Sequence, residues 1–146
     1  MTASSPSPSQ RLRDAAIKVD APMTVLPPAE VARVRRVVEE RYTEPGSTGR
    51  LSARFVKATR VEDNDGWERI GPMLRNRPVI VFFDLEEDAT MLRFSSAFDF
   101  GLSLVEAFGV SFYVADQATT FVLGVTDDGH VVGVGEAAGW LAKSVR

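Results

Sequence analysis

The chain contains Val110-Ser-Phe-Tyr-Val-Ala115, Thr120-Phe-Val-Leu-Gly-Val-Thr126 and His130-Val-Val-Gly-Val134 in close succession. Each segment has the length and the β-branched, aromatic composition that are typical of a strand. Asp127-Asp128-Gly129 separates the last two, and Asp-Gly between apolar runs is a strong hairpin signal. The stretch therefore predicts an antiparallel meander, and the rest of the chain is interpreted around it.

The clearest helix signal covers Pro28–Tyr42. Proline suits the first helical position because no N–H is needed there, and Glu30 lies in the first turn, where the helix dipole favours an acid. Apolar residues recur at helical spacing along this segment, and Pro45-Gly46 follows its end.

Other segments complete the expected fold. Pro78–Phe83 is a continuous apolar run of the kind that forms a buried central strand. The alternation in Leu51–Val61 favours extended structure, although helical spacing fits it too. Further expectations are a strand at Met91–Phe94, helices at Gln10–Val19, Ser96–Phe108 and Glu136–Val145, and a short helix carrying Trp67, Ile70 and Leu74.

The helix expected at Ser96–Phe108 is apolar on two sides. Phe98, Leu102 and Val105 form its aligned apolar row, and Phe100, Leu104 and Ala107 add a second apolar side.

These elements predict a single α+β domain over residues 11–146. It has a mainly antiparallel sheet with a C-terminal meander or hairpin, and helices pack on one face of the sheet. Residues 1–10 are rich in Ser and Pro and are expected to be a disordered, dispensable tail. The predicted core brings together Phe83, Phe112, Phe121 and Trp140.

Composition narrows the function classes. The 146 residues are 45% hydrophobic and include no cysteine, which excludes disulfides, a thiol nucleophile and thiolate metal ligands. No apolar run is long enough for a membrane span, so we expect a cytoplasmic protein that does not bind a membrane. Residues 1–60 hold 11 Lys or Arg and 6 Asp or Glu, whereas residues 61–146 hold 6 and 14. This asymmetry favours a polar partner surface.

Gly133-Val-Gly135-Glu-Ala-Ala138 matches the dinucleotide-binding pattern and lies between an expected strand and an expected helix. Too few residues follow Ala138 for a second parallel strand and an acidic ribose ligand. Glycines at a strand-to-helix turn are the preferred interpretation, and we expect no cofactor.

Two groups of polar residues follow strands and are candidates for a site. Asp84, Glu86, Glu87 and Asp88 come after the buried strand, and Asp127, Asp128 and His130 occupy the hairpin turn. His130 is the only histidine, so neither a metal cluster nor a nucleophile beside a base is evident. We therefore predict no catalytic residues and no metal, and we assign these seven residues to partner binding.

The N-terminal half is rich in arginine, and this class of residue contacts phosphate in many nucleic-acid-binding proteins. The sequence pI of about 5.2 and the lack of a recognisable RNA- or DNA-binding pattern argue against that function. A solvated helix face is the preferred interpretation.

The C-terminal half resembles a group of small bacterial proteins. The resemblance rests on Phe112-Tyr-Val-Ala-Asp116, Asp127-Asp-Gly-His130 and Gly133-Val-Gly-Glu-Ala, followed by Trp140-Leu141. The family's paired histidines are here reduced to Gly129-His130. Proteins of this size and style often accompany bacterial toxins as immunity proteins, so the resemblance implies binding of a toxin without chemistry.

Two functions remain open at this point. The first is a non-enzymatic, immunity-type inhibitor that binds a protein partner such as a basic toxin. The second is a small hydrolase or nucleotide-handling enzyme that uses Asp84, Glu86, Asp128 and His130.

Overall fold

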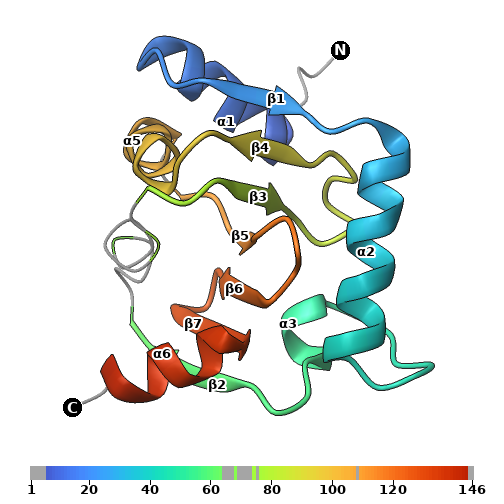
Figure 1. Ribbon diagram of the computed structural model, residues 1–146. Coiled ribbons are helices and arrows are strands. Elements are labelled where there is room, and N and C mark those ends of the chain that lie inside the picture. Colours follow the sequence, from blue (N-terminus) through green and yellow to red (C-terminus); the bar gives the residue numbers. More distant parts are fainter. Residues whose placement is uncertain (1–5, 64–67, 69–73, 75, 108, 145–146) are drawn as a thin grey trace, which may run out of the picture.

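The computed structural model describes residues 6–63, 68, 74, 76–107 and 109–144. Its centre is a seven-stranded sheet in the order β1-β4-β3-β5-β6-β7-β2, in which every neighbouring pair is antiparallel (Figure 1). The strands are β1 (Met23–Val25), β2 (Thr59–Glu62), β3 (Val79–Phe82), β4 (Leu92–Phe94), β5 (Phe112–Ala115), β6 (Phe121–Val125) and β7 (His130–Gly135).

Helices lie on both sides of this sheet (Figure 1). The described helices are α1 (Pro8–Lys18), α2 (Pro28–Tyr42), α3 (Leu51–Arg54), α5 (Ala97–Ala107) and α6 (Glu136–Ser144). Residues of α1, α5 and α6 share one hydrophobic core with the sheet, and residues of α2 and α3 share a second core with its other face.

The strand residues alternate between these two cores. In β3, Val79 and Val81 belong to the core beneath α1, α5 and α6, whereas Ile80 and Phe82 belong to the core beneath α2 and α3. The predicted single α+β domain with an antiparallel sheet is confirmed. The structure differs in having helices on both faces rather than one. A continuous apolar strand places apolar side chains on both faces of the sheet, so both faces must be covered.

Several local predictions are also confirmed. Helix α2 has the predicted bounds, β6 and β7 form the predicted hairpin, and Gly129 in its turn has a φ of 83°. Phe83, Phe112 and Phe121 are fully buried in one core, and Trp140 packs against that core, with ring centroids of Phe121 and Trp140 4.9 Å apart.

Only one of the two predicted apolar sides of α5 is buried. Phe98, Leu102 and Val105 are exposed by 61%, 40% and 61%, and the second apolar side, which includes Phe100 and Leu104, is the buried one. Both sides of α5 are apolar, so periodicity alone does not distinguish them. The side that is buried is determined by tertiary contacts: α5 packs against α1, and the Phe100 ring contacts the rings of Phe94 and Phe112.

The predicted boundary of the N-terminal tail is also wrong, because α1 begins at Pro8. The Ser7 hydroxyl accepts a hydrogen bond from the Gln10 N–H and caps the helix. Ser9 is buried, and its N–H donates to the Asp88 carboxylate at 2.9 Å. Ser and Pro favour this helix start as cap and first-turn residues, which the low-complexity interpretation overlooked.

Leu51–Val61 is partly helical instead of extended throughout. It contains the short helix α3, and only its last residues enter β2. The helix expected around Trp67 and Ile70 lies outside the described residues, except that Leu74 is buried.

Phe121→Ala should lower the free energy of unfolding by roughly 3–5 kcal/mol, because it leaves a cavity in a core without solvent access. Phe98→Ala on the exposed side of α5 is the matched control and should cost less than about 1 kcal/mol. Urea denaturation of both variants measures the difference, and equal losses would contradict the described burial.

Deletion of residues 1–10 should destabilise the domain by about 2 kcal/mol, because it removes the Ser7 cap and the bond from Ser9 to Asp88. Ser7→Ala alone removes only the cap and should cost about 1 kcal/mol. A deletion variant with unchanged stability in thermal denaturation would show that these contacts contribute nothing.

Candidate functional site

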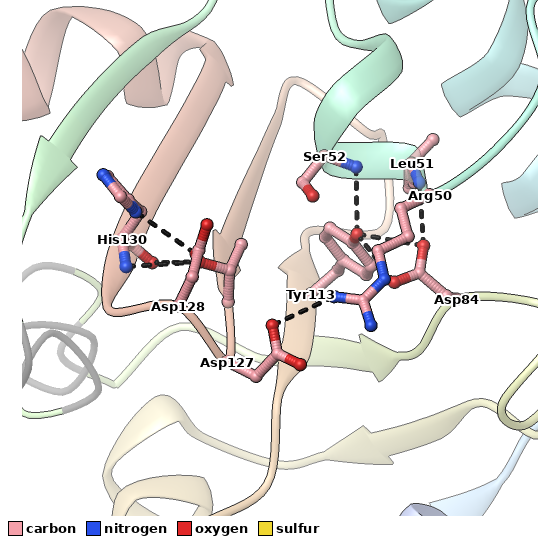
Figure 2. Close-up of polar contacts among 9 residues, drawn as sticks. Arg50, Leu51, Ser52, Asp84, Tyr113, Asp127, Asp128 and His130 are labelled. Atoms are coloured by element: carbon pink, nitrogen blue, oxygen red, sulfur yellow. Dashed lines mark hydrogen bonds and ion pairs between the residues drawn. The ribbon is translucent and has the colours of Figure 1, made fainter.

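The two groups of candidate residues lie at the same end of the sheet. Strands β3 and β6 are both antiparallel to β5, so they run in the same direction. The turns that follow these two strands therefore lie at the same end of the sheet. Residues from both turns, together with Arg50 and Ser52, line one small cleft (Figure 2). The structure therefore brings together the β3–β4 turn (Asp84–Asp88) and the β6–β7 turn (Asp127–His130).

Asp84 holds α3 in place from the start of the first turn. Its carboxylate accepts hydrogen bonds from the Leu51 N–H at 2.8 Å and from the Tyr113 hydroxyl at 3.0 and 3.1 Å. The same Tyr113 oxygen accepts from the Ser52 N–H at 3.0 Å (Figure 2). Burial raises the pKa of Tyr113 to about 12, and the negative charge of Asp84 adds to the rise. Tyr113 therefore keeps its proton and serves as a fixed link between β5 and α3.

Asp88 fixes the other end of the turn. Its carboxylate accepts from the N–H groups of Ser9 and Thr90, at 2.9 and 3.0 Å. Partial burial alone would raise the pKa of Asp88, but these hydrogen bonds outweigh it and hold the pKa below its usual value. Asp84 and Asp88 thus have mainly structural roles.

The residues between them are exposed. Leu85 is 62% exposed, and Glu86 and Glu87 also face solvent. Neither glutamate forms an ion pair with any residue in the described ranges. Partial desolvation and the nearby charge of Asp84 raise the pKa of Glu87, which shows that negative charge is crowded here.

The hairpin turn carries one exposed ion pair and one exposed contact between a histidine and a carboxylate. Arg50 contacts Asp127 at 2.9 Å and so bridges the space between the two turns, and His130 Nδ1 lies 3.2 Å from Asp128 (Figure 2). The Thr126 hydroxyl also donates to Asp128 and accepts from the His130 N–H. Because the side chains are exposed, these pairs contribute little to stability.

This arrangement gives little support to catalysis by the carboxylates. Asp84 is already bound to Tyr113 and Leu51, and His130 is paired with Asp128. Within the ranges that the structure describes, no three His, Cys, Asp or Glu side chains are grouped so that they could hold a metal ion.

The glycine motif has a packing explanation. A Cβ at Gly133 would lie 2.8 Å from Leu141 and 2.9 Å from the Ala137 backbone, so glycine lets α6 approach β7. Gly135 has a φ of 64°, and a Cβ there would lie 2.3 Å from the Thr120 carbonyl. Close packing and a left-handed backbone require both glycines, as the preferred interpretation expected.

Three arginines of α2 are bound to loop carbonyls. The predicted solvated face is confirmed only in part, because Arg36 and Arg41 are exposed whereas Arg33 and Arg35 are half-buried. Arg33 donates to Gln117 O, Arg41 donates to Ala118 O and Thr119 O, and Arg35 donates to Phe83 O and Asp88 O. These bonds pin α2 to the loops at the ends of the strands.

Tyr113, Arg50 and Arg35 were not recognised as site residues from the sequence. Only Tyr113 carried a signal, because a tyrosine in an otherwise apolar, buried strand needs a partner for its hydroxyl. The partners of both arginines lie more than 40 positions away in the chain, so local patterns do not reveal them.

Comparison of the chain with known proteins found no matching family model, curated protein or solved structure. In the described part of the chain, none of the helices combines the length and the apolar character that crossing a membrane requires.

Tyr113→Phe should lower the free energy of unfolding by about 1–3 kcal/mol, because it leaves the buried Ser52 N–H without its partner and removes a bond to Asp84. Asp127→Asn is the control, since it removes an exposed ion pair and should cost less than about 1 kcal/mol. Chemical denaturation measures the free energy of unfolding of both variants. An unchanged free energy of unfolding in Tyr113→Phe would rule out a stabilising link between β5 and α3.

Proposed function

We propose that this protein is a non-enzymatic, protein-binding domain that acts as an immunity-type inhibitor in the cytoplasm and binds a basic partner. The acidic end of the sheet is its binding surface, which we define as Leu85, Glu86, Glu87, Asp127 and Asp128. The observation that carries the proposal is the exposed tip of the β3–β4 turn, which is held rigidly at both of its ends.

The rigidity of this turn rests on backbone and side-chain contacts. The Asp84 carbonyl accepts from the N–H groups of Glu87 and Asp88 at 2.9 and 3.0 Å, which closes the turn. Arg35 donates to the carbonyls of Phe83 and Asp88 on either side of it. A loop that is ordered before binding loses less conformational entropy when a partner docks. This favours a recognition role for the side chains at the tip.

The chemistry of the tip indicates the kind of partner. Leu85 offers an exposed apolar contact, and Glu86 and Glu87, which follow it, form no ion pair among the described residues, although Arg50 attracts Glu87 from a longer distance. Asp127 and Asp128 extend the acidic surface across the cleft, although the ion pair of Asp127 with Arg50 partly offsets it. Such a surface accelerates association with a positively charged partner. A basic toxin, such as a nuclease, has the complementary charge.

The double variant Glu86→Lys/Glu87→Lys tests this proposal. It should fold normally, because both side chains are exposed and unpaired. It should slow association with a partner captured by the unmodified chain from its native host, and the difference should shrink as salt rises. Surface plasmon resonance at low and high salt measures both effects. Asp88 is left unchanged because it binds Ser9 and Thr90.

Glu40→Lys/Glu44→Lys is the matched control, because it changes the net charge equally at two exposed glutamates outside the binding surface. Its association rate should stay closer to that of the unmodified protein. Equal association rates for both double variants would show that the effect comes from net charge and not from the proposed surface. An unchanged association rate for Glu86→Lys/Glu87→Lys at low salt would place the interface elsewhere.

A further inference from the structure

A cavity of about 390 Å³ lies between α2, α3 and the β3–β4 turn. Val38, Leu51 and Phe82 supply apolar wall, Arg35 and Arg54 supply positive charge, and Ser47-Thr48-Gly49 forms part of the lining. This volume is within the range of small-molecule sites, and a mostly apolar wall with a few polar groups is their usual composition.

Arg35 is the unusual residue in this cavity. Among the described residues, its Nη2 bonds to the carbonyls of Phe83 and Asp88 at 3.1 and 3.4 Å, no other atom of the guanidinium has a hydrogen-bond partner, and its Nε is buried. No carboxylate in the described residues forms an ion pair with it. Burial lowers the pKa of Arg35 although Asp84 and Glu39 attract its charge. An arginine remains charged, so the cavity holds a cation without a direct counterion.

Three of the neighbouring acids do not supply that counterion because they are bound elsewhere, and the fourth, Glu86, lines the cavity but forms no ion pair with Arg35 among the described residues. Both oxygens of Glu39 accept from Arg54 at 2.6 Å, which also neutralises Arg54. Asp84 is held by Leu51 and Tyr113, and Asp88 is held by Ser9 and Thr90. Arg35 therefore remains available to an anion that enters from outside.

We propose that this cavity binds a small organic monocarboxylate, with its carboxylate on Arg35 and its apolar part against Val38, Leu51 and Phe82. A planar carboxylate matches the fork of donors that a guanidinium presents. Asp84 and Glu86 also line the cavity, and their negative charge disfavours a dianion such as phosphate. The site adjoins the proposed protein-binding surface, because Leu85 and Glu86 belong to both, but it requires neither Glu87 nor the hairpin turn.

The test follows the Arg35 side-chain Nε–H signal by ¹H–¹⁵N NMR during titration with sodium benzoate. Benzamide is the matched probe, because it has nearly the same shape without the charge. Benzoate should shift the signal saturably, and benzamide should bind at least about tenfold more weakly, since hydrogen bonds between charged groups are stronger than neutral ones. Sodium phosphate should bind more weakly than benzoate.

Substitutions at Thr48 change the charge of the cavity lining without touching Arg35. Thr48 is exposed and makes no hydrogen bond in the described structure, so its variants should fold normally. At low salt, Thr48→Lys should tighten benzoate binding and Thr48→Glu should weaken it, each about two- to threefold, as Coulomb's law gives for a unit charge roughly 8 Å away in water. Thr48→Gln is the neutral control and should bind like the unmodified protein.

The proposal is overturned if benzoate causes no saturable shift of the Arg35 signal up to tens of millimolar. It also fails if benzamide binds equally well, or if the Lys and Glu variants of Thr48 bind alike. None of these results depends on Glu86 or Glu87 contacting a protein partner, so the two proposals fail independently.

Discussion

Burial of the sheet on both faces is the constraint on which the rest of this structure depends. Every residue of β3 and β5 is buried, so the side chains of each strand must enter two different cores. One layer of helices satisfies only half of this requirement, and α2 with α3 supplies the other half. The helix α3 is too short to form by itself. Its position is set by hydrogen bonds to Asp84, which follows β3, and to Tyr113 of β5. The acidic turn is thereby part of the architecture that closes the second core.

Helix α2 carries four of the eleven basic residues in the first 60 positions of the chain. Its arginines donate to carbonyls in the loops that join β3 to β4 and β5 to β6. Loop carbonyls at strand ends have no ladder partner, and a guanidinium carries enough donors to satisfy several of them. Arg33, Arg35 and Arg41 are therefore partly engaged in holding loops, although Arg41 remains exposed. The acids of the C-terminal half are divided differently, because Asp84 and Asp88 are bound internally while Glu86 and Glu87 are not.

The features that were predictable from the sequence are those with strong local signals. Pro28 and the spacing of Val34 and Val38 define α2, and Asp128-Gly129 defines the hairpin. The bounds of α3 were not predictable, because its first N–H groups are bound by Asp84 and Tyr113 from distant strands. The buried side of α5 was not predictable either, because both of its sides are apolar. In the candidate site, a run of four acids within five positions gives no indication that its ends face inward and its middle faces solvent.

Arg35 links the two surfaces for which we propose functions. The same guanidinium lines the cavity and, through Nη2, binds the two carbonyls that flank the turn carrying Leu85 and Glu86. The anion that we propose for this cavity would share the guanidinium with these carbonyls and would therefore change how firmly the turn is held. If a partner requires the turn in its present conformation, the anion and the partner are coupled. By thermodynamic linkage the coupling is reciprocal, so that each alters the affinity of the other by the same factor.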